Sequence, residues 1–551
     1  MADDRARTVP RLLQLSAAKY GDRIAVADGA VRLTFAELRA LAERAARGFL
    51  ALGIRPGDRV GIWAPNSATW MACSLGAQSA GAVVVPINTR YRAYEARELL
   101  ARTDAAVLVV ADGFLGYDYL AALRRTDREL AQEAADGGAE PPKTSVTRIV
   151  NVSGDAAPVP DTALGAGVLT WAQFLDGGAA VPDAALEDAR STVGPGDLSE
   201  IIFTSGTTGR SKGVMLTHAG ALDLYYTYGA IWGVRPGDRY LVSLPFFHTG
   251  GNKAGMMLSL IFGMTVIPFP VFDPVHAMQV IESEGVTVMN GPPTVYATIL
   301  DHPRRGEFNL GSLRVAATGA AVVPESLVER ARTELPFENF ITAYGLTECC
   351  GTATMCRSTD PTSVVAATNG AALPGVELKV VGPDGAGLPA GEPGEVLIRG
   401  ANVTPGYWRD PDATAAAIDA GGWLHTGDIG HLDADGHLKI TDRLKDLFIV
   451  GGFNVSPAEV EQVLARHQDI SEVTVIGVPD ARLGEVARAY VIPRPGANPD
   501  SDQIIAWCRE RLANFKVPRT VEFVTTLPRN ASGKVLKHEL RRAATNPQPQ
   551  K

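Results

Sequence analysis

Short apolar segments that predict buried strands alternate with helical patterns through much of the chain. The strand patterns lie at residues 58–63, 82–86, 201–203, 240–245, 286–290, 313–317 and 340–343. The helical patterns lie at residues 9–20, 34–52, 70–80 and 117–133. Strands that alternate with helices in this way form parallel sheets with helices on their faces. The sequence therefore predicts an α/β fold with doubly wound βα subdomains.

The rest of the chain carries two other patterns. Residues 375–440 are rich in glycine, valine and turn residues, which predicts an antiparallel β subdomain. From Pro457 onward, helical and strand segments mix over about 100 residues, a usual domain size. A chain of 551 residues also exceeds one hydrophobic core. We therefore predict a large N-terminal domain at 1–444 and a small, mobile α+β domain at 445–551. Residues 112–195 are less regular; within them, residues 134–142 and the Pro/Ala/Gly segments after Gly154 are interpreted as surface insertions.

The composition argues against several classes of partner. The net charge of −9 and the pI near 5.6 disfavour nucleic acid and anionic membranes. Five cysteines without paired metal spacing indicate free thiols in a reducing, cytoplasmic setting. The N-terminus lacks a secretory pattern, and no apolar run reaches the roughly 20 residues of a membrane helix. We therefore expect no integral membrane segment, and an anionic ligand has to be held by local donors.

A loop at residues 204–213 has the composition of a phosphate-binding site. It follows the apolar run 201–203 and contains three glycines, five hydroxyl residues and two cations. Glycine allows the backbone N–H groups to approach a ligand, while hydroxyls and cations bind phosphate oxygens. The spacing differs from that of a Walker A loop. The candidate phosphate ligands are Thr204, Ser205, Gly206, Thr207, Thr208 and Lys212.

Three later strand patterns end in small or polar residues. Ligands of open α/β sheets bind beyond the carboxyl ends of the strands, so these residues are candidates for a site. They are Phe247 and His248, then Gly319, Ala320 and Ala321, and then Tyr344, Gly345, Thr347 and Glu348. The Tyr344 ring offers a face for a purine, Thr347 a hydroxyl for phosphate, and Glu348 an oxygen ligand for Mg²⁺.

Two further polar residues lie nearer the C-terminus. Asp428 follows the segment 423–427, and a carboxylate can accept hydrogen bonds from both hydroxyls of a ribose. Lys534 lies in a turn of small residues that can present it to another domain.

Taken together, these motifs resemble those of the adenylate-forming superfamily. The matching strings are Thr-Ser-Gly-Thr-Thr-Gly at 204–209, Tyr-Gly-Leu-Thr-Glu at 344–348, Trp-x-x-Thr-Gly-Asp at 423–428, and the regions of His248 and Lys534. They occur in the family's order, and the resemblance covers nearly the whole chain. The runs 291–296 and 442–446 make the chain similar to actinobacterial carboxylic acid–CoA ligases of the fatty-acid-ligase type. One of these loads a steroid-ring fragment onto CoA.

The resemblance implies ATP-dependent formation of an acyl-adenylate, followed by attack of the CoA thiol. It implies that Thr347, Glu348, His248 and Lys534 are catalytic, with Glu348 binding Mg²⁺. The implied nucleotide-binding set is Thr204, Ser205, Gly206, Thr207, Thr208, Lys212, Gly319, Ala320, Ala321, Tyr344, Gly345, Asp428 and Arg443. The implied acid pocket contains Phe247, His248, Asn252, Lys253, Gly319, Gly345 and Cys349.

For the second half-reaction, relatives rotate the small domain about a hinge. That hinge corresponds to Lys445 here, and the implied CoA-binding residues are Gly451, Gly452, Phe515, Lys516 and Arg519. The implied substrates are an acid, ATP and CoA, and relatives are often homodimers.

Two departures keep other functions open. Cys349 and Cys350 follow Glu348, where relatives often have small residues without sulfur; they are interpreted as pocket lining rather than as nucleophiles. Asn252 and Lys253 are also distinctive. One interpretation is that either residue meets a polar group of the substrate. The alternative for Lys253 is that it faces solvent. The alternatives are acyl transfer to a carrier protein, an ATP-dependent diazotase that activates nitrite for an aryl amine, and a non-catalytic nucleotide-binding relic.

Overall fold

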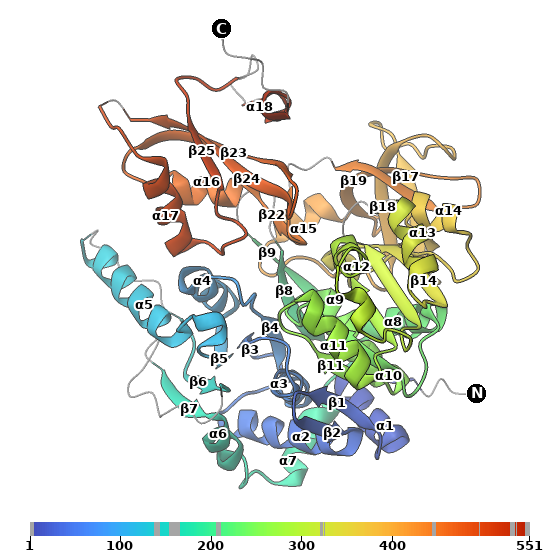
Figure 1. Ribbon diagram of the computed structural model, residues 1–551. Helices are drawn as coiled ribbons and strands as arrows, with labels where there is room; N and C mark the ends of the chain where they lie inside the picture. Colours follow the sequence, from blue (N-terminus) through green and yellow to red (C-terminus); the bar gives the residue numbers. More distant parts are fainter. Residues whose placement is uncertain are drawn as a thin grey trace. The chain divides into compact units, whose positions relative to one another are not determined.

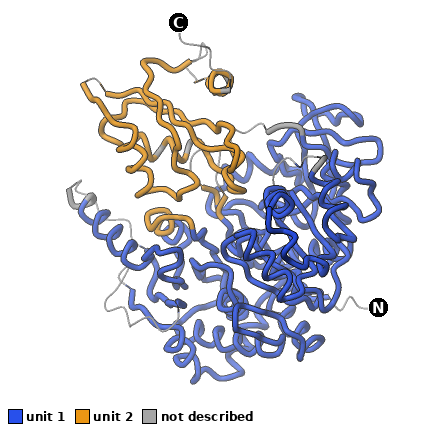
Figure 2. The backbone as a smooth tube through the Cα atoms, in the orientation of Figure 1, with its two compact units in different colours: residues 1–89, 99–202, 213–442 blue, residues 90–98, 203–212, 443–551 orange. Residues whose placement is uncertain are grey.

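The computed structural model describes residues 5–136, 144–153, 166–204, 211–319, 323, 325–443, 448–494, 496–528, 535 and 537–545. It divides into two compact units, which Figure 2 colours separately. The first contains residues 1–89, 99–202 and 213–442, and the second contains residues 90–98, 203–212 and 443–551. The domain boundary predicted at 444–445 lies outside the described residues, so its position stays a prediction.

The first sheet has a parallel centre. Its strands are β1 (Ile24–Asp28), β2 (Val31–Thr34), β10 (Arg239–Val242), β11 (Thr265–Pro268), β12 (Val288–Gly291), β13 (Val315–Gly319), β14 (Asn339–Tyr344), β15 (Thr354–Met355) and β16 (Ala371–Ala372). Their order is β16-β15-β14-β13-β12-β10-β11-β1-β2, with parallel pairing from β14 to β1. The chain leaves β10 for β11 on one side and returns to β12 on the other. This reversal is a topological switch point, where open α/β sheets bind their ligands.

The second sheet is built from the other set of βα units. Its strands are β3 (Arg59–Trp63), β4 (Val83–Pro86), β5 (Ala105–Val110), β6 (Arg148–Asn151), β7 (Gly167–Thr170), β8 (Leu198–Thr204) and β9 (Lys212–Thr217), in the order β7-β6-β5-β3-β4-β8-β9. Strands β6 and β7, with α6 (Trp171–Gly177) and α7 (Asp183–Ser191), occupy the region that the sequence analysis left irregular. Both strands have only four residues, too short for a periodic pattern to be recognised.

Helices pack against these sheets and against one another. Besides α6 and α7 they are α1 (Val9–Tyr20), α2 (Phe35–Ala51), α3 (Ala68–Ser79), α4 (Ala93–Thr103), η1 (Phe114–Gly116), α5 (Tyr119–Asp136), α8 (His218–Trp232), α9 (Thr249–Gly251), η2 (Asn252–Met257), α10 (Leu258–Phe262), α11 (Pro274–Glu284), α12 (Pro293–Leu300), η3 (Arg305–Glu307), α13 (Glu325–Glu334), η4 (Thr347–Cys349), α14 (Thr362–Ala367) and α15 (Pro411–Ala417). Helices α1, α2 and α3 contact one another (Figure 1). A capping box is present at the start of α2, with Thr34 and Glu37 each accepting a backbone N–H of the other.

The predicted antiparallel β subdomain is confirmed. Strands β17 (Val376–Val381), β18 (Gly394–Gly400), β19 (Leu424–Leu432) and β20 (Leu438–Arg443) are neighbours in that order. Register pairs along β17, β18 and β19 are antiparallel, and Val380, Val396 and Leu438 form a small core. The subdomain delivers Asp428 from the middle of β19.

The second unit has its own sheet and core. Its strands are β21 (Phe448–Val450), β22 (Phe453–Val455), β23 (Ile470–Asp480), β24 (Gly484–Pro493) and β25 (Thr520–Phe523), and its helices are α16 (Pro457–Leu464), α17 (Ser501–Arg511) and α18 (Lys537–Thr545). Successive residues of a strand face opposite sides of the sheet. Val475 of β23 accordingly packs with α16 and α17, while Ile476 packs in a second core with Leu540 of α18. Figure 1 shows these helices beside the sheet.

Among the described residues, every helix is too short or too polar to cross a membrane.

We predict that the contact between α2 and α3 requires glycine at position 76. A Cβ atom there would lie 2.7 Å from the carbonyl oxygen of Ala42 and 2.8 Å from the Cβ of Ala45. Because backbone atoms cannot move aside cheaply, Gly76→Ala is expected to lower the free energy of unfolding by about 1–3 kcal/mol despite its better helix propensity. The matched control is Gly177→Ala in α6, where no atom lies within 4 Å. Urea unfolding should show little change for the control, and equal stability of the two variants would contradict the prediction.

Candidate active site

His248 follows β10, the strand at the switch point. Its backbone N–H donates to the Pro245 carbonyl, and its Nδ1 accepts the Gly250 N–H at 3.2 Å. The imidazole is exposed, yet the surrounding protein removes enough water to lower its pKa. The neutral ring therefore carries its proton on Nε2 and offers that N–H to a ligand.

The ends of β13 and β14 lie at the same edge of this sheet. Gly319 pairs in register with Ala343, and a Cβ at Gly319 would lie 2.6 Å from the Ala343 carbonyl oxygen. At Gly345, a Cβ would lie 2.4 Å from the Cα of Thr352. The two glycines thus permit a close backbone approach where the sequence places the nucleotide and the acid.

A hydrogen bond joins two of the predicted nucleotide-binding residues. The Tyr344 hydroxyl donates to Asp428 Oδ2 at 2.7 Å, and Asp428 itself is 3% exposed. Burial, and then the Asp428 carboxylate, raises the pKa of Tyr344, so the phenol remains a donor. The Thr426 hydroxyl accepts the Asp428 N–H and donates to the Val396 carbonyl, which fixes this part of β19 against β18. The Tyr344 hydroxyl, a neutral donor, thus helps to orient the carboxylate.

Glu348 is held in a comparable way. Its Oε1 accepts from the Tyr407 hydroxyl at 2.9 Å, and its carbonyl accepts the Thr404 N–H at 2.7 Å. Burial, followed by the nearby Glu348 charge, raises the pKa of Tyr407. Thr347 precedes Glu348 in the short helix η4 and is buried. Tyr407 is a residue that the sequence analysis missed, because a lone tyrosine in a loop gives no signal of its partner.

Lys253 is neither solvent-exposed nor available to a substrate carboxylate in this structure. Its ammonium forms an ion pair with Glu200 of β8, and both side chains are 1% exposed. Glu200 also accepts from Ser199 at 2.7 Å and from Gln78 at 3.4 Å. The sequence analysis missed Glu200, since a single acidic residue in a strand pattern does not indicate a buried cation elsewhere. The solvent-exposed position predicted for Lys253 is therefore wrong, and its pairing with Glu200 disfavours binding of a substrate carboxylate.

The cysteine pair is also enclosed. Cys349 and Cys350 are fully or almost fully buried, and burial raises the pKa of each thiol to about 12. A thiol with that pKa is protonated at neutral pH and is a poor nucleophile. The interpretation as lining is favoured, and Tyr225 donates to the Cys350 carbonyl at 3.1 Å from beneath.

The second unit contains further described candidates. Thr204 and Lys212 flank the phosphate loop and are partly exposed, as is Phe515, whereas Gly451, Gly452 and Arg519 are exposed. Lys516 is different: its ammonium is 2% exposed and pairs with Glu95 at 2.8 Å and Glu459 at 2.6 Å. With two carboxylate partners, Lys516 does not present a free cation to CoA in this arrangement. Phe515 stacks on Phe453, with ring centroids 4.5 Å apart.

Several predicted residues cannot be placed. Ser205, Gly206, Thr207, Thr208, Ala320, Ala321, Lys445 and Lys534 lie outside the described residues, and the side chain of Arg443 is not described. Their roles stay predictions. Phe247 is described and partly buried beside His248.

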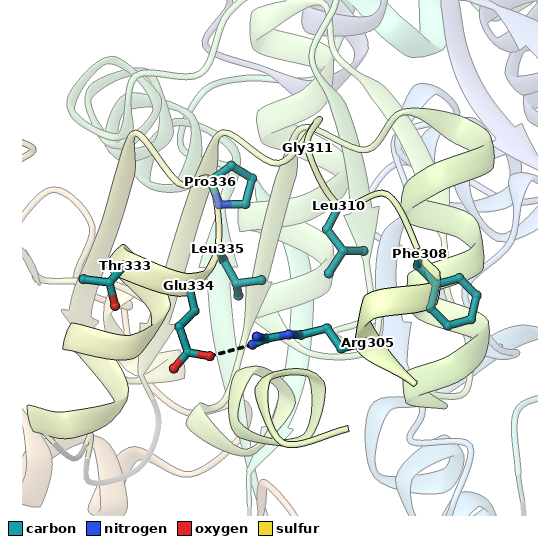
Figure 3. A pocket seen from close by; sticks show the side chains of 8 residues that line it. All are labelled: Arg305, Phe308, Leu310, Gly311, Thr333, Glu334, Leu335 and Pro336. Carbon is teal, nitrogen blue, oxygen red and sulfur yellow. Dashed lines mark hydrogen bonds and ion pairs between the residues drawn. The ribbon is translucent and has the colours of Figure 1, made fainter. Parts of the chain in front are cut away.

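A surface hollow occurs elsewhere on the first unit (Figure 3). It lies between Phe308 and Leu310 on one side and the end of α13 on the other, with an Arg305–Glu334 ion pair of 2.8 Å in its wall. It contains none of the predicted site residues and is not assigned to the chemistry.

A tyrosine–aspartate pair and a glutamate near the switch edge of an α/β sheet, in a chain whose sequence also carries a glycine-rich loop, are typical of a nucleotide-dependent, adenylate-forming enzyme. The AMP-binding enzyme family model matches residues 13–408, and the model of its C-terminal domain matches residues 459–534. The chain belongs to the AMP-binding enzyme family.

Individual relatives are similar over nearly their full lengths. A Rhodococcus jostii CoA ligase, named for a propanoyl group that carries a methyl-dioxo-octahydroindenyl ring system, is 47% identical over 98% of this chain and 99% of its own. An equivalently named Mycobacterium tuberculosis ligase is 48% identical over 97% and 98%. An o-succinylbenzoate CoA synthetase variant from Bacillus subtilis, solved with its product analogue, is 26% identical with a TM-score of 0.78, covering 96% of this chain and 98% of its own.

We predict that removing one charge of the Glu200–Lys253 ion pair destabilises the protein more than removing both charges. Lys253→Met leaves a buried carboxylate without its cation and is expected to lower the free energy of unfolding by about 3–5 kcal/mol. Glu200→Gln combined with Lys253→Met removes both charges and should recover most of that loss. Chemical denaturation of the two variants tests this, and a double variant no more stable than Lys253→Met would contradict it.

His218 predicts a dependence of stability on pH. The Val9 N–H donates to its Nδ1 at 3.2 Å, and burial lowers its pKa to about 4. Between pH 6.5 and 4 the unfolded chain binds a proton that the folded chain excludes, so stability falls as the pH falls. The expected contribution of this group is about 3 kcal/mol over that window. Unfolding curves at several pH values should have a shallower pH slope for His218→Gln, and an unchanged slope would refute this.

Proposed function

We propose that the protein is an AMP-forming acid–CoA ligase. In the first half-reaction, a carboxylate oxygen attacks the α-phosphorus of ATP, giving acyl-adenylate and pyrophosphate. In the second, the CoA thiol attacks the acyl carbon and AMP leaves. The observation that carries the proposal is the Tyr344–Asp428 hydrogen bond at the edge where β14 and β19 deliver both residues. Such chemistry depends mainly on positioning and on neutralising charge.

Each candidate has a role in this reaction. The ring of Tyr344 stacks on adenine, and Asp428 with Arg443 holds the ribose. The loop residues Thr204, Ser205, Gly206, Thr207, Thr208 and Lys212 hold the β- and γ-phosphates, with Gly319, Ala320, Ala321 and Gly345 leaving room for the nucleotide. Thr347 donates to the α-phosphate, and His248 Nε2–H faces the acid. Phe247, Asn252 and Cys349 complete the pocket.

The residues present suit a magnesium ion. Glu348 supplies a carboxylate oxygen, and its partner Tyr407 is neutral, so the negative charge is retained. Mg²⁺ is usually held by one or two carboxylates together with substrate phosphates. The ion would screen charge on the phosphates. Glu348 orients it from the same short helix that carries Thr347.

Lys534 is proposed to donate to the carboxylate and the α-phosphate as negative charge develops. The second half-reaction then requires rotation of the C-terminal domain, residues 445–551, about Lys445. This motion exchanges Lys534 for the Gly451–Gly452 loop, which borders the CoA thiol. Phe515 and Arg519 remain candidates for the CoA nucleotide, whereas Lys516 joins them only if it leaves its two carboxylates.

The acid is proposed to bear a ring, as in the two ligases at 47% and 48% identity. A cytoplasmic location and a homodimer complete the proposal. The diazotase alternative loses one of its supports, because Lys253 is neutralised by Glu200. The relic is disfavoured by the intact Tyr344, Asp428 and Glu348.

We predict that purified protein converts ATP, a ring-bearing acid and CoA into AMP, pyrophosphate and a thioester. Lys534→Ala should slow acyl-adenylate formation by at least about 100-fold, because a positioned donor in the transition state is lost. The mutation should spare thioester formation from supplied acyl-adenylate. The matched control is Lys439→Ala, at an exposed lysine of β20.

Mass spectrometry of the products separates the possibilities. AMP formation without consumption of CoA would support the CoA-independent alternatives, and nitrite with an aryl amine tests the diazotase directly. Unimpaired adenylation by Lys534→Ala would refute the role of that lysine.

A further inference from the structure

Asn252 is a buried polar residue whose side-chain amide makes no hydrogen bond to the described residues. Its side chain is 0% exposed, and neither Nδ2 nor Oδ1 has a hydrogen-bond partner among the described residues. Leaving a buried amide unpaired costs roughly 1–3 kcal/mol. Such a cost persists in a well-packed protein where a ligand supplies the missing partner.

The backbone places Asn252 close to the acid site. Its N–H donates to the carbonyl of His248 at 2.9 Å, so Asn252 lies one helical turn after that histidine. Helical side chains lean toward the N-terminus of their helix, which directs Asn252 back over the turn of His248. Asn252 also opens the π-helical turn η2, and single π turns occur often at functional sites.

The charges around Asn252 determine which substrate group its amide can bind. The adjacent cation, Lys253, is buried in its pair with Glu200, so the turn presents no net positive charge to a ligand. A second substrate carboxylate buried here would lack a counter-charge and would be strongly disfavoured. A carbonyl oxygen can accept from the amide Nδ2, and a hydroxyl can both accept and donate.

On the basis of the proposed function, we propose that Asn252 is the specificity residue that hydrogen-bonds a neutral oxygen, a carbonyl or a hydroxyl, on the ring of the acid. Asn252 selects such acids over their hydrocarbon analogues. A pocket that hydrogen-bonds an oxygen rejects the analogue without it, because the buried amide is then left unpaired.

The ring reaches Asn252 by displacing flexible side chains. Met256 and Met257 follow within the same π-helical turn, and both are buried. Their side chains lean back toward Asn252 by the same geometry that directs Asn252 toward His248. Methionine changes shape at low cost, so these two residues give way to a ring that brings its own hydrogen-bonding group.

The test uses three acids and three variants of the full-length protein. The acids are cyclohexylpropanoate, its ring-ketone analogue, and an analogue with a carboxylate in place of the ketone. The variants are Asn252→Leu, which keeps the volume, Asn252→Ala, and the control Ser259→Ala. Ser259 is a buried polar residue of the next helix, but it donates to the Gly255 carbonyl at 2.8 Å. The readout is kcat/KM for acyl-adenylate formation with each acid.

The wild-type protein should prefer the ketone over cyclohexylpropanoate by about tenfold or more, and the dicarboxylate should be the poorest. Asn252→Leu should reduce that preference to within about twofold, while the KM for ATP stays unchanged. If Asn252→Leu fails to fold, Asn252→Ala should show the same loss of preference. Ser259→Ala should keep the wild-type preference. Unfolding of Asn252→Leu should occur at no lower denaturant concentration, since an unpaired amide is removed.

The outcomes separate this inference from the proposed function. Equal turnover of ketone and hydrocarbon by the wild type, or a preference that survives in Asn252→Leu, overturns the inference but leaves the ligase assignment intact. Absence of AMP with every acid overturns both.

Discussion

Parallel pairing of β10, β12, β13 and β14 is the constraint on which the rest of the site depends. Because these strands run in the same direction, the segments that follow them all emerge at one edge of the sheet. The reversal of strand order at β10 opens that edge at His248. Residues about 100 positions apart, such as His248 and Tyr344, therefore belong to one site by topology.

The glycines at this edge of the sheet are required because neighbouring backbone segments approach each other closely. At Gly345 and Gly319 a side chain would collide with backbone atoms, which cannot rotate away. Gly351 has a φ of +98° and a hypothetical Cβ 2.8 Å from the Thr249 Cβ. That close approach joins the segment after Glu348 to the turn that begins at His248, so the proposed nucleotide and acid subsites share one wall.

The sequence allowed much of this to be predicted, and the reason differs by element. Helix α1 was predicted with its observed bounds, and α2 to within a residue at each end, because apolar periodicity and the Thr34–Glu37 cap act locally. Strands β6 and β7 were missed because four residues carry too little periodicity. The motif residues His248, Tyr344 and Asp428 were found because their neighbours in sequence form recognisable strings.

The partners of those residues were not predictable in the same way. Tyr407 and Glu200 contact residues 59 and 53 positions away, and neither occurs in a motif that names its partner. Pairing across such distances is decided by the packed structure. The wrong interpretation of Lys253 has this origin, because the sequence around the lysine does not show that Glu200 is its ion-pair partner.

Three carboxylates of the first unit, those of Glu200, Asp428 and Glu348, have described partners of different charge. Glu200 faces a cation, so its charge is cancelled inside the core and is unavailable to a ligand. Asp428 and Glu348 each accept a hydrogen bond from a phenol, that of Tyr344 and of Tyr407 respectively, and a phenol does not neutralise a carboxylate. A neutral donor fixes the orientation of a carboxylate while leaving its full charge for a ribose hydroxyl or a metal ion. Raised tyrosine pKa values keep both phenols protonated, which maintains this arrangement at neutral pH. The charge of the described partner therefore distinguishes Glu348, which is suited to bind a ligand, from Glu200, which serves the fold.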